Sequence, residues 1–550
     1  MKKIISIIII AVLLVSCEDR FLRVNSDPNS TVPDEIIAAD FNFITRFIAP
    51  TRNLTAGQTG EDLATDAFVR HVGTPTNFEG NRNNTTYFVV DGWNDNMFNA
   101  IYNSMMSPMH SLKKITSEEG YDLLTNWADL LQVFGLSRLT VYHGPLIYSE
   151  YGLPQDEFVY DSEKFLYEQF FEKLDKIQAV FKTYSGYSTV VSNPAYSAEA
   201  ANMRKGDLTY DGDINKWMKM INSLRLRLAM RIVKVDAGWA KTEGEKAIAD
   251  PAGLILANTN NFFHNITGVN QFWTFSETWN DSRMGAGMEE VLVGYKDPRI
   301  HKWFQPVPAA FKTAHPSYVF PGGSAFEYKG IASGSYIIAK DDRLSFSKGS
   351  TYWQSVRERM LLDASEVNFI LAEAVLRGWD VTNAGNKTAE QYYEDGIRRS
   401  MERWEVTTAA VDAYLADNTS LPINYTDPVD SRNSYDTRQT LTIKWSDEGG
   451  DKNKQLERIM TQKWIACFNN ANEIWSDHRR TGFPKLHYTP KNDSDATWGT
   501  IADDDFLKRM PYVQRERQNN PAYDRNSALL GAGGDKISTR LWIHPEGSNF

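Results

Sequence analysis

Apolar residues recur every three or four positions over much of the chain, which is the spacing of one face of an α-helix. A first helix is expected near Asp34, after a stretch rich in Asn, Ser, Asp and Pro. The clearest periodic stretches predict helices over Met97–Thr116, Leu123–Tyr142, Ser162–Tyr184, Asn215–Val235 and Lys241–Ala257. The pattern therefore predicts a mainly α-helical protein.

Two helices further along carry the most regular apolar stripes. The helix Asp363–Gly378 begins with Asp363 and Glu366 in the positions of a capping box and ends at a glycine, a typical C-terminal stop. In Asn453–Trp475 the apolar stripe includes Cys467, so we expect a buried thiol. Small residues at the centre of both stripes predict a close approach of paired helices.

Long irregular stretches separate the helices, and their length favours binding loops over simple connections. These stretches are Thr51–Gly92, Asn258–Gly287, Tyr295–Gln354, Pro422–Asp451 and Lys485–Phe550. A short strand pair is expected between Thr85–Val90 and Tyr336–Ile338. The chain has neither a fixed 34-residue period nor the usual helical-repeat signature, and divergent helix pairs stay open as an alternative.

The N-terminus has the pattern of a bacterial lipoprotein leader. Lys2 and Lys3 precede the apolar or small residues of Ile4–Val15, a run too short to span a bilayer, which takes about 20 residues. A leucine at position −3 and Ser16 at −1 precede Cys17, whose sulfur takes a diacylglycerol in such proteins. We therefore predict a signal peptide at residues 1–16 and lipidation of Cys17; the alternative is a chance cysteine after an apolar segment.

Lipidation would attach the mature protein to a membrane, because two acyl chains already give a stable anchor. Glu18 and Asp19 resemble the acidic export signals of lipoproteins on the outer leaflet of a Gram-negative outer membrane, which predicts surface exposure. Residues 17–33 would form a lipidated tether. Residues 34–550 are predicted to form a single globular domain, since no Pro-, Gly- or Ser-rich linker divides them.

Composition narrows the class of protein. Removal of the leader deletes two lysines and no acids, which takes the formal charge from −11 to −13. A nucleic-acid-binding protein needs a basic footprint, so nucleic acid is excluded as a partner. With Cys17 lipidated, Cys467 has no intramolecular partner, and a disulfide framework is excluded as well.

Motifs of common catalysts are missing from the sequence: there is no GxSxG, GxxxxGK[ST], HExxH or CxxC, and the nine histidines are scattered. Asp211 and Asp213 begin like a calcium loop, but Lys216 stands where that loop needs Gly, so Asp213 is predicted to be a helix N-cap. Acidic loops at Asp493–Asp495 and Asp503–Asp505 are interpreted as solvated surface. No metal or cofactor is expected. Carboxylate pairs for sugar hydrolysis stay open, because 70 acidic residues always supply some pair.

Several strings resemble a known family. The segment Trp217–Arg231 is similar to the "W…NSLRLRLAMR" helix of the SusD-like (RagB/SusD) outer-membrane lipoproteins. Asp297-Pro298-Arg299 and Gln462–Ala466 occur in the order of that family, and Asp27-Pro28-Asn29 matches the tether of one of its branches. The resemblance covers nearly the whole mature chain.

These motifs have a structural interpretation of their own. In the Trp217–Arg231 helix, Leu224 and Leu228 are expected to be buried. The arginines of that helix would pair with acids or carbonyls. Arg479 and Arg480, placed just beyond a helix end, would meet the negative end of its dipole.

The resemblance implies a superhelix of tetratricopeptide-like helix pairs that supports an irregular, loop-rich ligand-binding lobe. It also implies a partner, a SusC-like TonB-dependent transporter, on which the protein acts as a lid that captures nutrients, usually oligosaccharides. Such a protein is not an enzyme. Ligand residues of the family vary, so none can be transferred by motif.

Candidate ligand residues therefore come from local composition. Two irregular segments, Phe78–Trp93 and Asn270–Arg283, combine aromatic rings with planar hydrogen-bonding side chains, which suits the apolar face and hydroxyls of a pyranose. The predicted ligand-binding residues are Phe78, Tyr87, Trp93, Trp273, Trp279, Asp281 and Arg283. For any single Trp the alternative is a buried packing residue. Peptides or another nutrient stay open as cargo, and a surface hydrolase is the remaining alternative.

Overall fold

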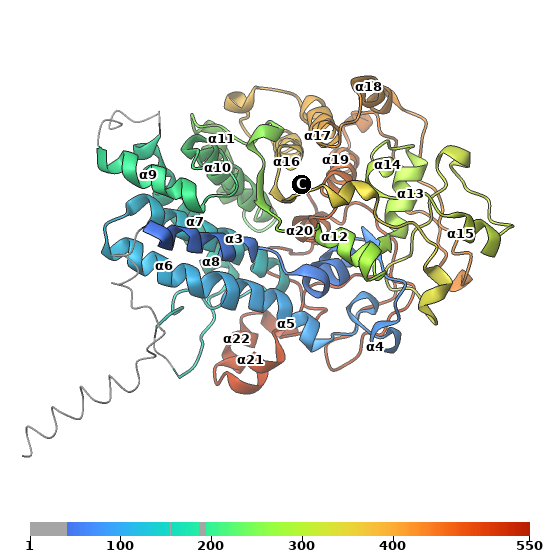
Figure 1. Cartoon of the computed structure of the whole chain (residues 1–550), viewed down its shortest axis with the longest axis horizontal. Coiled ribbons are helices and arrows are strands. Elements are labelled where there is room, and N and C mark those ends of the chain that lie inside the picture. The colour runs from blue at the N-terminus through green and yellow to red at the C-terminus, as the bar shows by residue number, and fades with distance from the viewer. Residues whose placement is uncertain (1–40, 154–155, 186–193) are drawn as a thin grey trace, which may run out of the picture.

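The computed structural model describes residues 41–153, 156–185 and 194–550 (Figure 1). The predicted leader, Cys17, the tether and the start of the helix expected near Asp34 lie outside the described residues. Within them, no helix combines the length and apolar character that a membrane crossing requires.

Antiparallel helix pairs form one side of the molecule (Figure 1). The pairs are built by neighbours in sequence, with α6 against α7, α7 against α8, α10 against α11 and α16 against α17. Their bounds are Ser107–Glu118 (α6), Asp122–His143 (α7), Glu163–Tyr184 (α8), Ile214–Arg231 (α10), Ala237–Ala249 (α11), Ala364–Leu376 (α16) and Ala389–Arg403 (α17). The mainly α-helical prediction is confirmed.

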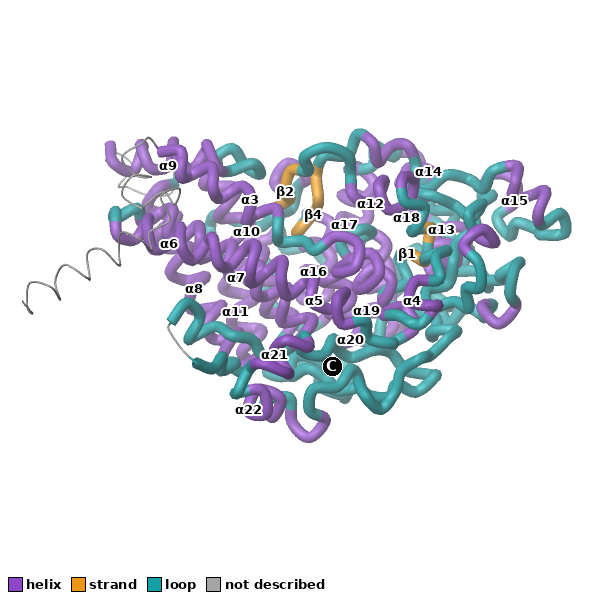
Figure 2. The backbone as a smooth tube through the Cα atoms, turned by 60° about the horizontal axis from the view of Figure 1, so that its bottom comes forward, coloured by secondary structure: helices purple, strands orange, loops and turns teal. Residues whose placement is uncertain are grey.

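The other side is rich in loops and short elements, as Figure 2 shows by its teal segments. Its sheet structure, within the described residues, consists of two antiparallel pairs, β1 with β3 and β2 with β4. The remaining labelled elements are α3 (Ile48–Arg52), β1 (Val72–Gly73), α4 (Phe78–Asn81), α5 (Asp91–Asn99), α9 (Pro194–Gly206), β2 (Phe262–Asn265), α12 (Gln271–Trp273), β3 (Arg283–Met284), α13 (Ala286–Gly294), α14 (Ile300–Trp303), α15 (Ala309–Ala314), β4 (Glu358–Leu362), α18 (Thr408–Ala416), α19 (Lys452–Ala466), α20 (Ala471–Thr481), α21 (Gln514–Asn519) and α22 (Tyr523–Ala528).

The predicted strand pair between Thr85–Val90 and Tyr336–Ile338 is wrong. Asn83 instead caps a 3-10 helix, Asn84–Thr86, by accepting a hydrogen bond from the backbone N–H of Thr85. The chain then turns through a left-handed residue, which no regular strand accommodates.

Several predicted helices have different bounds. The helix predicted over Met97–Thr116 begins earlier, at Asp91, and runs through α5, a π-helical stretch and α6 to Glu118, and the helix predicted over Asn215–Val235 ends at Arg231. The stretch Asn453–Trp475 forms two helices, α19 and α20, because the chain turns between them at Asn469, whose φ is +64°. Cys467 is buried at this break, as the apolar stripe predicts. Helix α11 ends at Ala249, eight positions before the predicted end at Ala257, since the residue before Pro251 is disfavoured in a helix.

The predicted N-terminal signals are present. Asp213 caps α10 by accepting from the N–H of Lys216, and Asp363 caps α16 by accepting from the N–H of Glu366. The side chain of Glu366 does not complete a capping box, because it pairs with Arg227 of α10 at 2.6 and 2.8 Å.

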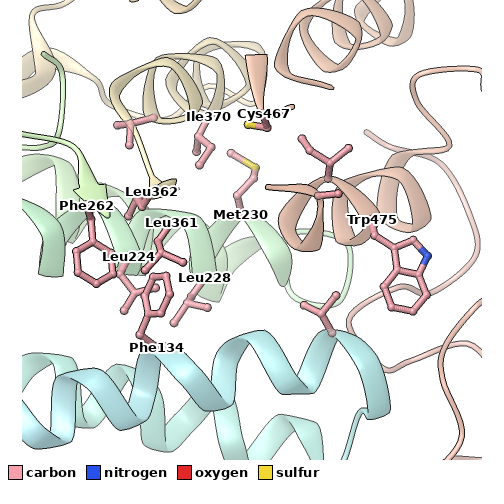
Figure 3. Close-up of a cluster of buried hydrophobic side chains, with 14 of the residues drawn as sticks. Phe134, Leu224, Leu228, Met230, Phe262, Leu361, Leu362, Ile370, Cys467 and Trp475 are labelled. Atoms are coloured by element: carbon pink, nitrogen blue, oxygen red, sulfur yellow. The ribbon is translucent and has the colours of Figure 1, made fainter. Parts of the chain in front are cut away.

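The apolar core lies where α7, α10 and β4 meet. Figure 3 shows Phe134 of α7 facing Leu224 and Leu228 of α10, with Leu361 and Leu362 of β4 above them. Both predicted leucines of α10 are fully buried. The helix pairs are therefore joined by one continuous apolar layer.

Buried ion pairs tie these helices together. Arg227 and Arg231 of α10 bind Glu366 of α16 and Glu473 of α20, respectively, and all four side chains are buried. The third arginine of the motif helix, Arg225, pairs with Asp175 of α8 and Glu243 of α11. The arginine heads thus find acidic partners, as predicted; the partners of Arg227 and Arg231 are buried, whereas Asp175 is partly exposed.

Arg479 and Arg480 lie in the last turn of α20 rather than beyond it. Arg479 donates to the carbonyl of Val141 in the last turn of α7 at 2.7 Å, so the helix C-terminus that it meets there belongs to a different helix from the predicted one. Arg480 pairs with Glu373 of α16 at 2.6 Å, which adds a further buried cross-link.

Candidate functional site

The two segments predicted to bind ligand lie next to each other in the loop-rich half. Thr76, just before Phe78–Trp93, donates from Oγ1 to Oδ1 of Asp281 at 2.6 Å. Lys340 donates from Nζ to the same Asp281 oxygen at 2.7 Å. Both segments and a third loop therefore meet at Asp281, whose Oδ1 accepts both hydrogen bonds.

Phe78 in the first turn of α4 and Trp93 in the first turn of α5 form an aromatic pair. Their ring centroids lie 5.5 Å apart at an interplanar angle of 85°, an edge-to-face arrangement. Both side chains are half-buried, so each keeps part of its surface open to solvent.

Trp279 is the most exposed predicted ring, with 49% of its surface accessible. Its ring centroid lies 5.3 Å from that of Phe275, a buried ring against which Trp279 packs. Trp273 in α12 is half-buried. Trp279 therefore packs on a buried aromatic residue and keeps about half of its surface open to solvent.

Tyr87 and Arg283 have structural contacts. The Tyr87 hydroxyl accepts from Nη2 of Arg70 at 3.1 Å, and both side chains are buried. Arg283 is fully buried, donates to the carbonyl of Ser276 at 3.1 Å, and has its pKa lowered to about 10 by burial. Contact of either residue with a ligand stays a prediction; here the two side chains brace the segments that carry the rings.

A polar pocket of about 460 Å³ opens beside these segments, between α3, α5, β2 and α12. Asn270 and Gln271 on its wall lie three and two positions before Trp273. Asn96 on its opposite wall lies one helical turn after Trp93. None of the described residues that line the pocket is acidic. The polar residues lining it are Arg52, Asn53, Thr55, Asn96, Asn99, Ser104, His264, Asn265, Thr267, Asn270, Gln271 and Arg359.

Two buried side chains in this wall keep unused polar atoms. Asn270 uses Oδ1 to accept from the N–H of Phe272, whereas its Nδ2 has no partner among the described residues. His264 contacts Thr55 Oγ1 through Nε2 at 3.2 Å and leaves Nδ1 without a partner there. Burial lowers the pKa of His264 to about 4, so the ring is neutral at neutral pH. Both unpartnered atoms are buried, so the amides that the pocket presents to a ligand are the more exposed ones, among them those of Asn96, Asn99 and Gln271.

Sequence reasoning missed the pocket residues on α5 and β2. A signal was present, because Asn96 and Asn99 follow Trp93 at three-residue spacing and share its helix face. The contribution of His264 and Arg359 had no local signal, since β2 and β4 meet only in the folded chain.

The described residues contain no group of three or more His, Cys, Asp or Glu side chains arranged to hold a metal ion. In the acidic loop Asp493–Asp495, Asp495 pairs with Arg82 at 3.0 Å and Asp493 pairs with Lys491. The loop at Asp503–Asp505 supplies Asp505 to Lys508.

The family model described as "Susd and RagB outer membrane lipoprotein" matches residues 25–544. The chain belongs to the SusD-like family. A search among curated proteins returned no significant match.

Solved structures of SusD homologues share the fold. A chitin-binding SusD homologue from Flavobacterium johnsoniae is 33% identical, with a TM-score of 0.82, over 92% of this chain and 100% of that one. A SusD homologue from Bacteroides vulgatus is 29% identical, with a TM-score of 0.80, over 93% and 100% of the two chains. A SusD-like protein from Bacteroides thetaiotaomicron is 25% identical, with a TM-score of 0.78, over 92% and 99%. The predicted tetratricopeptide-like helical class is confirmed by this likeness.

Proposed function

We propose that this SusD-like protein captures oligosaccharides at the surface of an outer membrane and delivers them to a SusC-like TonB-dependent transporter. The proposal includes a signal peptide at residues 1–16, lipid on Cys17, a tether at 17–33 and one domain at 34–550. The family description, which names outer membrane lipoproteins, supports this location. We further propose that the protein binds its glycan without cleaving it.

The observation that carries the proposal is an amide-lined pocket whose wall includes Asn270 and Gln271, because these residues belong to the same segment as the exposed ring of Trp279. A pyranose ring presents an apolar C–H face to an aromatic ring and its hydroxyls to amide groups. The pocket wall has no carboxylate, so it has no general acid or base of the kind that glycoside hydrolysis requires. A neutral sugar fits this lining well.

Chitin oligosaccharides are the first ligands to test. The Flavobacterium johnsoniae homologue is described as chitin-binding. Each unit of chitin carries an N-acetyl group, whose N–H and C=O can pair with the O and N–H₂ of Asn and Gln side chains. The asparagines of the pocket therefore match this substituent chemically.

The test is calorimetric titration with tetrasaccharides of chitin, cellulose, xylan and starch, together with short neutral peptides. We expect binding of at least one sugar and a loss of about tenfold in affinity for Trp279→Ala, equivalent to about 1.4 kcal/mol. Phe550→Ala is the matched control, because this terminal ring is 43% exposed and lies outside the segments that form the pocket.

Three results would contradict the proposal. Peptide binding without sugar binding would assign another cargo, and release of reducing ends from a polymer would indicate a hydrolase. If Trp279→Ala and Trp93→Ala bind the sugar with unchanged affinity, these two rings do not contact the ligand. For the anchor, Cys17→Ala should abolish incorporation of labelled palmitate and release the protein from membranes.

A further inference from the structure

We propose that the protein has a second oligosaccharide-binding site, in an aromatic cleft on the opposite side of α5 from the amide pocket. The cleft has a volume of about 580 Å³ and is walled by Phe98, Tyr102, Tyr151, Phe158, Arg515 and Glu516. This inference rests on the proposed function for the class of ligand, and on separate residues for the site.

Stacked tyrosines form one wall. The rings of Tyr102 and Tyr151 lie 5.9 Å apart at an interplanar angle of 28°. Tyr102 comes from the π-helical turn Ala100–Met106 that continues α5, and Tyr151 comes from the loop after α7. The Tyr151 hydroxyl donates to the carbonyl of Tyr102 at 3.4 Å, which holds the half-buried Tyr151 ring over its neighbour.

Phe158 forms the opposite rim, and its backbone is clamped by two asparagines. The side chain of Asn520 accepts from the N–H of Phe158 at 3.1 Å and donates to its carbonyl at 2.8 Å. Asn526 donates to the same carbonyl at 2.8 Å. The ring nevertheless remains 43% exposed. Because the backbone is fixed on both sides, the ring is held outward as an apolar surface that a ligand can cover.

Planar polar groups complete the cleft. The Arg515 guanidinium lies 5.0 Å from the ring centroid of Phe98 and 3.3 Å from a carboxylate oxygen of Asp95. Glu516 Oε2 accepts from the Tyr160 hydroxyl at 3.0 Å. One cation and one anion in the wall balance each other, so the cleft favours a neutral ligand with an apolar face and hydrogen-bonding edges.

The two sites share a wall. Asn96 and Asn99 of the segment 91–106 line the amide pocket, whereas Phe98 and Tyr102 of the same segment line the aromatic cleft. Helix α21, which supplies Arg515, lies beside α5 in Figures 1 and 2, and the N–H of Gln514 at its start donates to Asp91 of α5 at 2.8 Å. The sites are thus separated by about one helix diameter, roughly 10–12 Å.

The test is the stoichiometry of binding, measured by calorimetry with the same four tetrasaccharides. We expect two sites in the parent protein and one in Phe158→Ala, with the affinity of the remaining site unchanged. Phe158→Trp should keep both sites, because it restores a ring. Leu529→Ala is the matched control. Leu529 directly follows α22 and is 44% exposed, a fraction close to that of Phe158, but it does not line the cleft.

The second site alone would be overturned if the parent binds one sugar molecule per protein and Phe158→Ala binds sugar with the same affinity and stoichiometry. A parent protein that binds none of the sugars would overturn the proposed function as well. A melting temperature within about 1 °C of the parent will show that Phe158→Ala is folded, as expected for truncation of an exposed ring. If Phe158→Ala no longer binds a partner protein, while parent and variant both bind one sugar molecule, the cleft is a protein contact and the proposal is wrong.

Discussion

Replacement of Arg231 by methionine should cost the protein several degrees of thermal stability. Arg231 of α10 donates from Nε to Oε2 of Glu473 at 3.0 Å and from Nη1 to the carbonyl of Ser137 at 2.6 Å. Both members of the ion pair are buried. Burial alone would lower the pKa of Arg231, but Glu473 outweighs it and raises that pKa, so the pair is ionised.

The magnitude follows from the geometry. Arg231→Met would leave the Glu473 carboxylate buried, with Arg227 3.8 Å away and already bound to Glu366. Loss of one partner from a buried ion pair costs about 3–5 kcal/mol. An unfolding entropy of about 2.1 cal/mol/K per residue, over roughly 500 residues, gives about 1 kcal/mol per degree. The melting temperature should therefore fall by about 3–5 °C.

Differential scanning calorimetry at one scan rate will measure this change. The double variant Arg231→Met/Glu473→Leu should recover most of the loss, because it leaves no unpaired charge. Arg398→Met is the control, since Arg398 pairs with Asp412 at 2.7 Å on the exposed surface and should change the melting temperature by less than about 1 °C. An Arg231→Met variant that melts at the parent's temperature, or a double variant that melts as low as the single one, would contradict this role of the Arg231–Glu473 pair.

Further predictions concern one carboxyl group, one helix cap and one thiol. Burial raises the pKa of Glu163 to about 7 from its ordinary 4.5, so the folded state holds this proton more tightly and stability should fall as pH rises from about 4.5 to 7. Glu163→Gln should flatten the melting temperature over that range, and an unchanged slope would contradict this assignment. Asp213→Ala should cost about 1 kcal/mol through loss of the α10 cap, whereas Asp213→Asn should be close to neutral in thermal unfolding. Burial raises the pKa of the Cys467 thiol, so a form without Cys17 should react with a maleimide only after unfolding in urea; rapid labelling of the native protein would refute this.

The long helices were predictable because their apolar periodicity extends over many turns. Helices α7 and α8 begin and end within one residue of the bounds set by that pattern. The break between α19 and α20 was missed because the apolar stripe continues across it. A left-handed residue sets the break, Asn469, and the pair Asn469-Asn470 is a local signal that periodicity alone does not weigh.

The binding region was predictable only in part. Aromatic composition predicts Trp279 and Phe78 as ligand residues, and the structure brings the segments that carry them together at Asp281. The pocket itself is assembled from residues as far apart in sequence as Arg52 and Arg359, and no local pattern connects them. Contacts of this range arise from packing of complete elements, which also explains why the predicted strand pair was wrong while β2 and β4 pair across about a hundred residues.

The pocket wall is fixed to the helical half by a buried carboxylate. Glu61 accepts from Arg138 of α7 at 2.6 Å and from Arg359 of β4 at 2.7 Å. Outward movement of β4 would separate buried charges, at a cost of about 3–5 kcal/mol, so this wall is preformed. A ligand that enters the pocket therefore orders little backbone, and differences in affinity among sugars should come from the contacts of the asparagines and rings themselves.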